Sequence, residues 1–140
     1  TLQQKIALAI LMPVVASMGG IAGTQTLIIV TRGIATGRVT TANIKTLINK
    51  EVAVSGLNGI IWSIVIGLIT YYWFADLLLS LIIALAIITN LVVAAFSGAF
   101  LPLLLSKLKI DPALAGGVIL TTITDVIGFV AFLGLAALFI

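Results

Sequence analysis

The fold is decided by one stretch of the sequence, residues 77–106, which reads LLLSLIIALAIITNLVVAAFSGAFLPLLLS and contains no charged side chain. An α-helix rises by about 1.5 Å per residue, so roughly 20 apolar residues cross the hydrocarbon core of a bilayer. This run exceeds that length. It therefore predicts a helix that spans a membrane.

Three further stretches, at about residues 6–31, 53–74 and 113–139, are similarly apolar, and Asp125 is the only charged residue within them. They are continuous rather than alternating runs, which argues against the strands of a membrane β-barrel. The sequence predicts an all-α integral membrane protein. We expect residues 1–140 to form a single transmembrane domain, a bundle of four helices with a basic loop at about residues 32–51.

The composition agrees with a membrane location and limits the chemistry. Hydrophobic residues make up 62% of the chain and charged residues 8%, whereas a soluble domain has about a quarter charged. Histidine and cysteine are absent. This excludes disulfides, thiol nucleophiles and imidazole catalysis, and any metal site must be built from oxygen.

The cationic residues indicate the orientation in the membrane. Six of the seven fall in the loops at one end of the predicted bundle: Arg32, Arg38, Lys45, Lys50, Lys107 and Lys109. Cytoplasmic loops of membrane proteins carry an excess of lysine and arginine. We therefore expect a multi-pass protein of a bacterial or archaeal plasma membrane with these loops in the cytoplasm, and no nucleic acid partner.

Residues 41–50 are expected to form a short interfacial helix, capped by Thr41 or Asn43.

Asp125 stands about halfway along the last predicted span, where an ionised carboxylate costs about 2.5–3.5 kcal/mol. No cation lies within a span, so water, a bound cation or a proton must neutralise it. Thr121 and Gly117 lie one and two turns earlier on the helix, and Gly128 lies one turn later. This small, polar stripe leaves room for a partly hydrated cation, or for a protonated aspartate that bonds to a neighbouring helix.

The first span is unusually rich in small and polar residues between residues 13 and 26. Such residues are unfavourable on a helix face that contacts lipid. We expect this helix inside the bundle. Gln25 needs partners there, and it either joins helices or lines a pore. The middle spans carry residues that we expect to pack and hydrogen-bond between helices: Ser55, Asn58, Gly59, Ser63, Thr89, Asn90, Ser97 and Gly98.

Three segments together resemble the membrane domain of the MgtE magnesium channel and transporter family. They are MPVVASMGGIAGTQT at residues 12–26, LPLLLSKLKIDP at residues 101–112 and TTITDVIG at residues 121–128. Their order and spacing also fit, so the resemblance covers essentially the whole chain. It leaves out the family's first membrane helix and its cytoplasmic N-terminal and CBS domains. We therefore expect a piece of a longer transporter, with a naturally short or split transporter as the alternative.

The resemblance implies a homodimer whose pore follows the two-fold axis and is lined by the helices that match the first and last spans. It implies that Asp125 holds a largely hydrated magnesium ion, with contributions from Thr121 and Gly117. Magnesium would be both the transported ion and a structural ligand in the pore. The residues expected to line that pore are Gly20, Gln25, Thr24 and Gly128.

These observations predict a channel or transporter for divalent cations, most of all magnesium, and not an enzyme. Magnesium loses its water reluctantly, so one aspartate per subunit that holds it through water suits this ion. The expected partners are magnesium, membrane lipid and a second copy of the chain. Two alternatives stay open: a proton- or sodium-coupled cation exporter that uses the same Asp125, and a non-transporting membrane assembly subunit.

Overall fold

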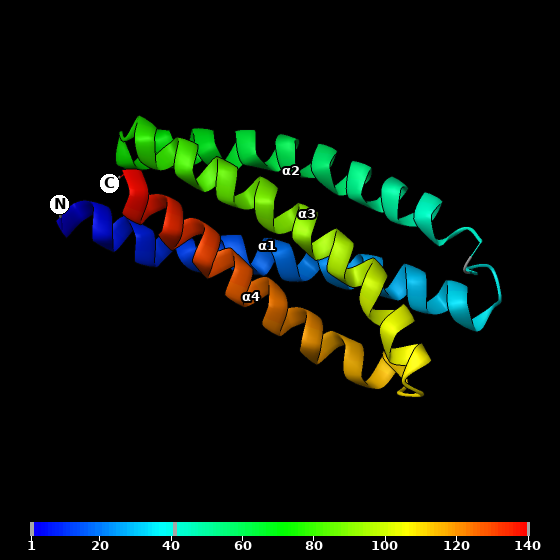
Figure 1. Ribbon diagram of the computed structural model, residues 1–140. Coiled ribbons are helices and arrows are strands. Elements are labelled where there is room, and N and C mark those ends of the chain that lie inside the picture. The colour runs from blue at the N-terminus through cyan, green and yellow to red at the C-terminus, as the bar shows by residue number, and fades with distance from the viewer. Residues whose placement is uncertain (1, 41, 140) are drawn as a thin grey trace.

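The computed structural model describes residues 2–40 and 42–139, with the side chains of all of these except residues 2–4, 113 and 114. It contains four helices, α1 (Leu2–Ala35), α2 (Ile44–Phe74), α3 (Leu77–Lys107) and α4 (Pro112–Phe139), as Figure 1 shows. All four are long and apolar enough to cross a membrane. The predicted all-α membrane fold is confirmed.

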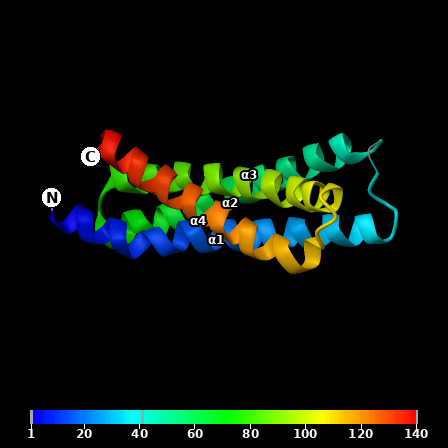
Figure 2. The ribbon, with the colours of Figure 1, turned by 60° about the horizontal axis from the view of Figure 1, so that its bottom comes forward.

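Helix α3 is the centre of the bundle. It packs against α1, α2 and α4, and α4 also packs against α1, whereas α1 and α2 touch at only a few positions. Half of the most apolar stretch of α3 is buried, a larger share than in any other helix. Helices α2 and α4 make no contact among the described residues, and Figure 1 shows α3 between them over most of their length, whereas they overlap in the view of Figure 2. The bundle is thus a three-helix unit of α1, α3 and α4, with α2 attached to it through α3.

The core has two apolar clusters separated by a layer of small and polar residues. The larger cluster includes Val15, Ile83 and Phe132, and the smaller consists of Leu27, Leu101 and Leu120. Between them lies what we call the glycine layer, formed by Gly19, Gly23, Asn90, Gly98 and Gly128. A methyl group on Gly19 would overlap the Asn90 amide, and one on Gly98 would lie 2.6 Å from the Gly23 carbonyl oxygen. Glycine at these positions lets the three helices approach closely.

The helices extend beyond the predicted spans, and most of this extension surrounds the first loop. Helix α1 continues to Ala35 and α2 begins at Ile44, so the connection is much shorter than the predicted basic loop of residues 32–51. The separate interfacial helix predicted at residues 41–50 is wrong, because residues 44–50 are the first turns of α2. Hydropathy marks only the apolar part of a helix, and extending an existing helix is cheap once it has nucleated.

The predicted caps also differ from the structure. Asn43 precedes α2, but its side chain makes no capping hydrogen bond and instead bonds to the preceding loop. Thr41 lies outside the described residues. At the next turn, Asp76 caps α3 by accepting a hydrogen bond from the Leu79 amide at 3.2 Å. This turn contains only Ala75 and Asp76, which ties α2 tightly to α3.

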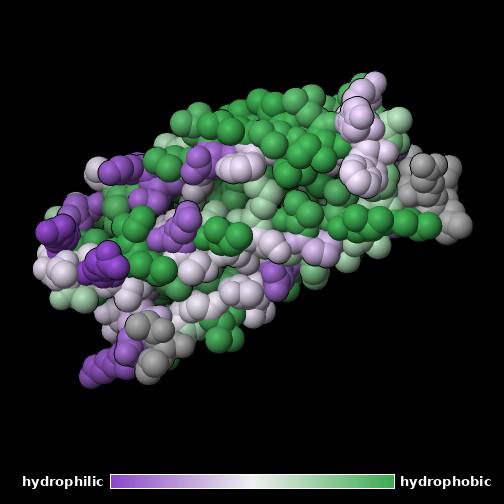
Figure 3. Space-filling view, turned by 180° about the vertical axis from the view of Figure 1, so that it is seen from behind, coloured by the Kyte–Doolittle hydropathy of each residue, from purple (hydrophilic) through white to green (hydrophobic). Residues whose placement is uncertain are grey.

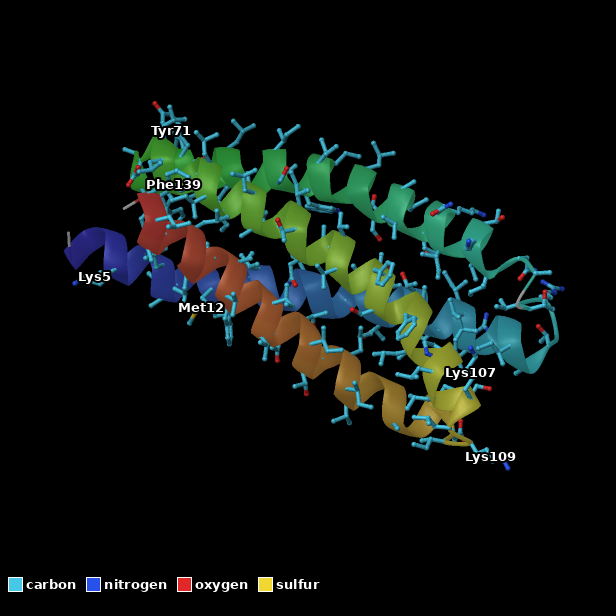
Figure 4. All side chains as sticks on the ribbon, viewed as in Figure 1. Lys5, Met12, Tyr71, Lys107, Lys109 and Phe139 are labelled. Atoms are coloured by element: carbon cyan, nitrogen blue, oxygen red, sulfur yellow. The ribbon has the colours of Figure 1, made fainter. Side chains whose placement is uncertain are left out.

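Polar and apolar surfaces are separated along the bundle. Apolar side chains cover most of the face in Figure 3, with hydrophilic atoms gathered toward one end. Figure 4 places Lys107 and Lys109 at the end opposite to Tyr71 and Phe139. We call the end that holds the α1–α2 loop and the α3–α4 turn the cationic end. The aromatic residues at the opposite end fit a membrane interface.

Candidate functional site

A groove runs between α1 and α4, with a volume of about 700 Å³. We call it the α1–α4 groove. Its lining from α1 is Pro13, Ala16, Ser17, Gly20, Ile21, Thr24 and Gln25, and its lining from α4 is Thr121, Asp125 and Phe129. Five residues singled out in the sequence therefore lie along one groove: Gly20, Thr24, Gln25, Thr121 and Asp125.

Asp125 is the only charged residue among those that line the groove. It is partly buried, and among the described residues no hydrogen bond or ion pair engages its carboxylate. Residues 2–40 and 42–139 also contain no cluster of three acidic side chains that would form a metal cage within one chain. A cation at Asp125 would need its remaining oxygen ligands from water, hydroxyl and backbone groups, or a second subunit.

Hydroxyl groups give the groove further oxygen atoms. The Thr24 hydroxyl donates to the Gly20 carbonyl oxygen at 2.7 Å, so its proton is used within α1. An oxygen that has given its proton in this way still offers lone pairs to a ligand. Thr24, Gln25, Ser17 and Thr121 are exposed on the isolated chain. They form a polar row that lipid would solvate poorly.

Two predicted site residues lie outside the lining of the groove. Gly117 is partly buried on α4, one turn before Thr121, and a methyl group there would meet no atom within 4 Å among the described residues. Gly128 is buried, and a methyl group there would lie 3.0 Å from the Asn90 amide nitrogen and 3.4 Å from the Ala16 Cα. The structure places Gly128 in the glycine layer, at a helix contact.

A second hollow of about 560 Å³ separates α1 from α2, because these helices touch so little. We call it the α1–α2 cleft. Gln25 borders both this cleft and the α1–α4 groove. Asn58, which we expected at a helix contact, is exposed and lines the cleft. Closer to the cationic end, the Thr26 hydroxyl donates to Glu51 at 3.5 Å, a hydrogen bond between α1 and α2.

Among the other polar residues of the middle spans, Asn90 fulfils the expectation most fully. It is completely buried, and its amide donates to the Val15 carbonyl oxygen of α1 at 2.9 Å. Ser55, Ser63, Gly59 and Gly98 are also buried. Thr89 is exposed instead, and its hydroxyl bonds to its own helix at Leu85.

Sequence reasoning did not assign Ser17 and Phe129 to the groove. Both follow from helix periodicity, since Ser17 lies three residues before Gly20 and Phe129 lies four residues after Asp125. Counting one turn back from Gly20 and one turn forward from Asp125 would have identified them.

Comparisons with known proteins bear on this arrangement. The model of a family described as MgtE, divalent cation transporter, matches residues 12–135. A magnesium transporter MgtE of Bacillus subtilis is 35% identical over 99% of this chain and 31% of its own length. Proteins of the same name match in Enterococcus faecalis, at 30% identity over 94% of this chain and 29% of theirs, and in Thermus thermophilus, at 31% identity over 98% and 30%.

This chain thus spans about a third of the length of the curated relatives it matches. The match covers the helices that form the groove and agrees with the expectation of a transporter rather than an enzyme. The resemblance drawn from three short segments is confirmed, and the chain belongs to the MgtE family of divalent cation transporters.

Proposed function

We propose that this chain forms the ion pathway of a magnesium transporter, with the α1–α4 groove as one wall of the pore and Asp125 as the ion site. The observation that carries the proposal is the position of Asp125. It lies midway along α4 in a groove lined by hydroxyl, amide and glycine groups, and no described residue neutralises it. Relatives that match nearly the whole chain are named magnesium transporters.

Thr121 lies one helical turn from Asp125 in the same groove, and Thr24, Gly20 and Gln25 face it from α1. Hydroxyl and backbone oxygens at such positions suit the outer water molecules of a hydrated magnesium ion. Gly117 continues the α4 stripe by one more turn, with no side chain to obstruct an ion. Gly128 would support the pore by letting α4 approach α1 and α3.

The groove is a half-pore on the isolated chain, and a homodimer would complete it. Its polar row of Ser17, Thr24, Gln25 and Thr121 is exposed, although the surrounding solvent is lipid. A second copy placed around a two-fold axis along the groove would cover this row and supply a second aspartate. The bundle would stand in the plasma membrane with the cationic end in the cytoplasm.

The role of Asp125 can be tested by magnesium flux into liposomes that contain the purified protein. Asp125→Ala and Asp125→Asn are both expected to lower the flux by about tenfold or more, which corresponds to the loss of about 1.4 kcal/mol of interaction with the ion. The control is Glu51→Gln, since Glu51 is a carboxylate near the membrane boundary that does not line the groove.

Equal fluxes for the original protein and both Asp125 variants would refute the ion site. The same liposomes distinguish the alternatives. Uptake that requires an imposed proton or sodium gradient would indicate a coupled carrier, and absence of flux in the original protein would indicate an assembly subunit.

A further inference from the structure

The cationic end holds a third hollow, which the proposed ion pathway does not use. It has a volume of about 680 Å³ and lies where α1 ends and α2 begins. We call it the cationic pocket. Its lining is Ile29, Arg32, Gly33, Thr36, Arg38, Val39, Asn43, Thr46, Leu47 and Lys50. It brings together three cations, one each from α1, the loop and α2.

The loop that carries Arg38 is folded back onto α1. The Val39 amide donates to the Gly33 carbonyl oxygen at 3.0 Å, and Gly37 adopts a left-handed conformation with φ of 76°. Gly33 is buried beneath Val39, and a methyl group at Gly33 would overlap the Val39 side chain. Glycine is required at both positions, one for the turn and one for the close approach.

Asn43 fixes this loop from the α2 side. Its amide nitrogen donates to the Arg38 carbonyl oxygen at 2.7 Å, and its amide oxygen accepts a hydrogen bond from the Thr40 backbone nitrogen at 2.8 Å. These two bonds bracket the loop and hold the Arg38 backbone beside the pocket. The Arg38 side chain therefore projects from an ordered backbone, which lowers the conformational entropy that the protein loses when Arg38 binds a ligand.

The pocket has an uncompensated positive charge. None of its ten lining residues is acidic, and no ion pair engages Arg32, Arg38 or Lys50 within the part of the chain that the structure describes. The nearest acid in sequence is Glu51, which accepts a hydrogen bond from Thr26 on α1 and does not line the pocket. The pocket thus favours an anion.

The chemistry of the lining indicates the kind of anion. Two guanidinium groups and an ammonium group suit phosphate oxygens, because a guanidinium forms paired, charge-assisted hydrogen bonds with them. Ile29, Val39 and Leu47 supply apolar surface in the same pocket. Ile28 and Ile29 lie within the predicted membrane span of α1, and each is about half exposed. A ligand with phosphate at one end and hydrocarbon at the other matches both surfaces.

We propose that the cationic pocket binds the phosphate headgroup of an anionic phospholipid, with the acyl chains lying along the exposed apolar surface of α1. Basic pockets between helices at a membrane boundary recognise such headgroups through charge and hydrogen bonding. The site is independent of the ion pathway, since the two hollows share no lining residue.

The test compares two variants with the same change in charge. Arg32→Gln, Arg38→Gln and Lys50→Gln together remove the cations of the pocket, while Lys45→Gln, Lys107→Gln and Lys109→Gln remove three cations at the same end that do not line it. Binding of phosphatidylglycerol and phosphatidylcholine to the detergent-purified chain is measured by native mass spectrometry. The pocket variant should lose about tenfold or more in affinity for phosphatidylglycerol, and the control variant less than about threefold.

Equal losses in the two variants would overturn the proposal, since they would reflect general attraction to the cationic end. Equal affinity of the original chain for phosphatidylcholine would also overturn it. Inorganic phosphate is the third probe. If it binds alone as tightly as phosphatidylglycerol and displaces it, the site is one for soluble phosphate and the lipid assignment fails.

A second variant, which changes no charge, distinguishes loss of the pocket from misfolding of the triple variant. Asn43→Ala keeps all three cations but releases the loop, so it should weaken phosphatidylglycerol binding severalfold while circular dichroism shows an unchanged helix content. Unaltered affinity in Asn43→Ala, together with unaltered affinity in the single variant Arg38→Gln, would contradict a preorganised pocket.

Discussion

Asn90 joins three helices at the middle of the bundle. Its amide donates to Val15 of α1, and it fills the space left beside Gly19 of α1 and Gly128 of α4. Its side-chain oxygen has no hydrogen-bond partner among the described residues. A large polar side chain fits in this core only because both neighbours are glycine, so the three residues are coupled.

This coupling predicts a non-additive effect. Gly19→Ala should destabilise the protein by about 1–3 kcal/mol, because its methyl group overlaps the Asn90 amide. Asn90→Ala should cost about 1–2 kcal/mol through the lost hydrogen bond to Val15. The double variant should cost clearly less than the sum, because alanine at residue 90 vacates the space that the new methyl group needs.

Reversible unfolding in mixed detergent micelles measures these free energies of unfolding. Thr89→Ala is the matched control, since Thr89 is exposed and bonds only within α3. Strictly additive costs would show that Gly19 and Asn90 do not compete for one space.

The packing of α3 on α1 depends on another glycine of the layer. A methyl group on Gly98 would lie 2.6 Å from the Gly23 carbonyl oxygen and 3.1 Å from the Thr26 Cβ. The first of these contacts is with a backbone atom, which cannot move away by changing rotamer as a flexible side chain can. The separation of α1 from α3 is therefore set by Gly98, and α1 in turn carries most of the groove lining.

Gly98→Ala should therefore lower the free energy of unfolding by about 1–3 kcal/mol. It should also reduce magnesium flux, because α1 would shift relative to Asp125. Gly56→Ala on α2 is the matched control, since a methyl group there meets no described atom within 4 Å. That substitution should stabilise the helix by about 0.5–1 kcal/mol. Equal effects of the two substitutions would show that close helix approach at Gly98 is unimportant.

The sequence predicted the four helices and, to within one residue, both ends of α3 and α4, but it misplaced both ends of α1 and the start of α2. Continuous apolar runs identify spans because lipid demands apolar residues over a fixed length. No comparable requirement on composition marks where a helix ends in water. The predicted spans therefore stop short of the ends of α1 and α2 at the cationic end. Gly37, with its positive φ, is the local signal that the first loop begins only there.

Helical spacing and the family resemblance together predicted part of the groove. Counting one turn back from Asp125 identified Thr121, and the resemblance implied Gly20, Thr24 and Gln25, which all lie along the groove. The same spacing selected Gly128, which lies in the glycine layer instead. Spacing defines a face of a helix, but the part of that face covered by neighbours depends on packing with α1 and α3.

For the whole molecule, the proposed dimer predicts a definite pattern of crosslinks. The chain has no cysteine, so single cysteines can be introduced without background. Thr121→Cys and Ser17→Cys, on the α1–α4 groove, should form disulfides between two copies under mild oxidation in liposomes. Leu68→Cys, on the exposed face of α2, should not.

Dimer bands on non-reducing gels measure this pattern. Crosslinking at Leu68 with none at Thr121 or Ser17 would refute a two-fold axis along the groove. The crosslinking result tests the proposed dimer independently of the proposed ion site, because it does not depend on magnesium flux.

The sparse contact between α1 and α2 has a consequence for biosynthesis. As the ribosome delivers the chain from its N-terminal side, these two helices reach the bilayer before α3 and have little apolar surface to share with each other. Each of the two makes its most extensive helix contact with α3, so neither is held in place until α3 has been inserted. We therefore expect α1 and α2 to associate stably only once α3 is in the membrane.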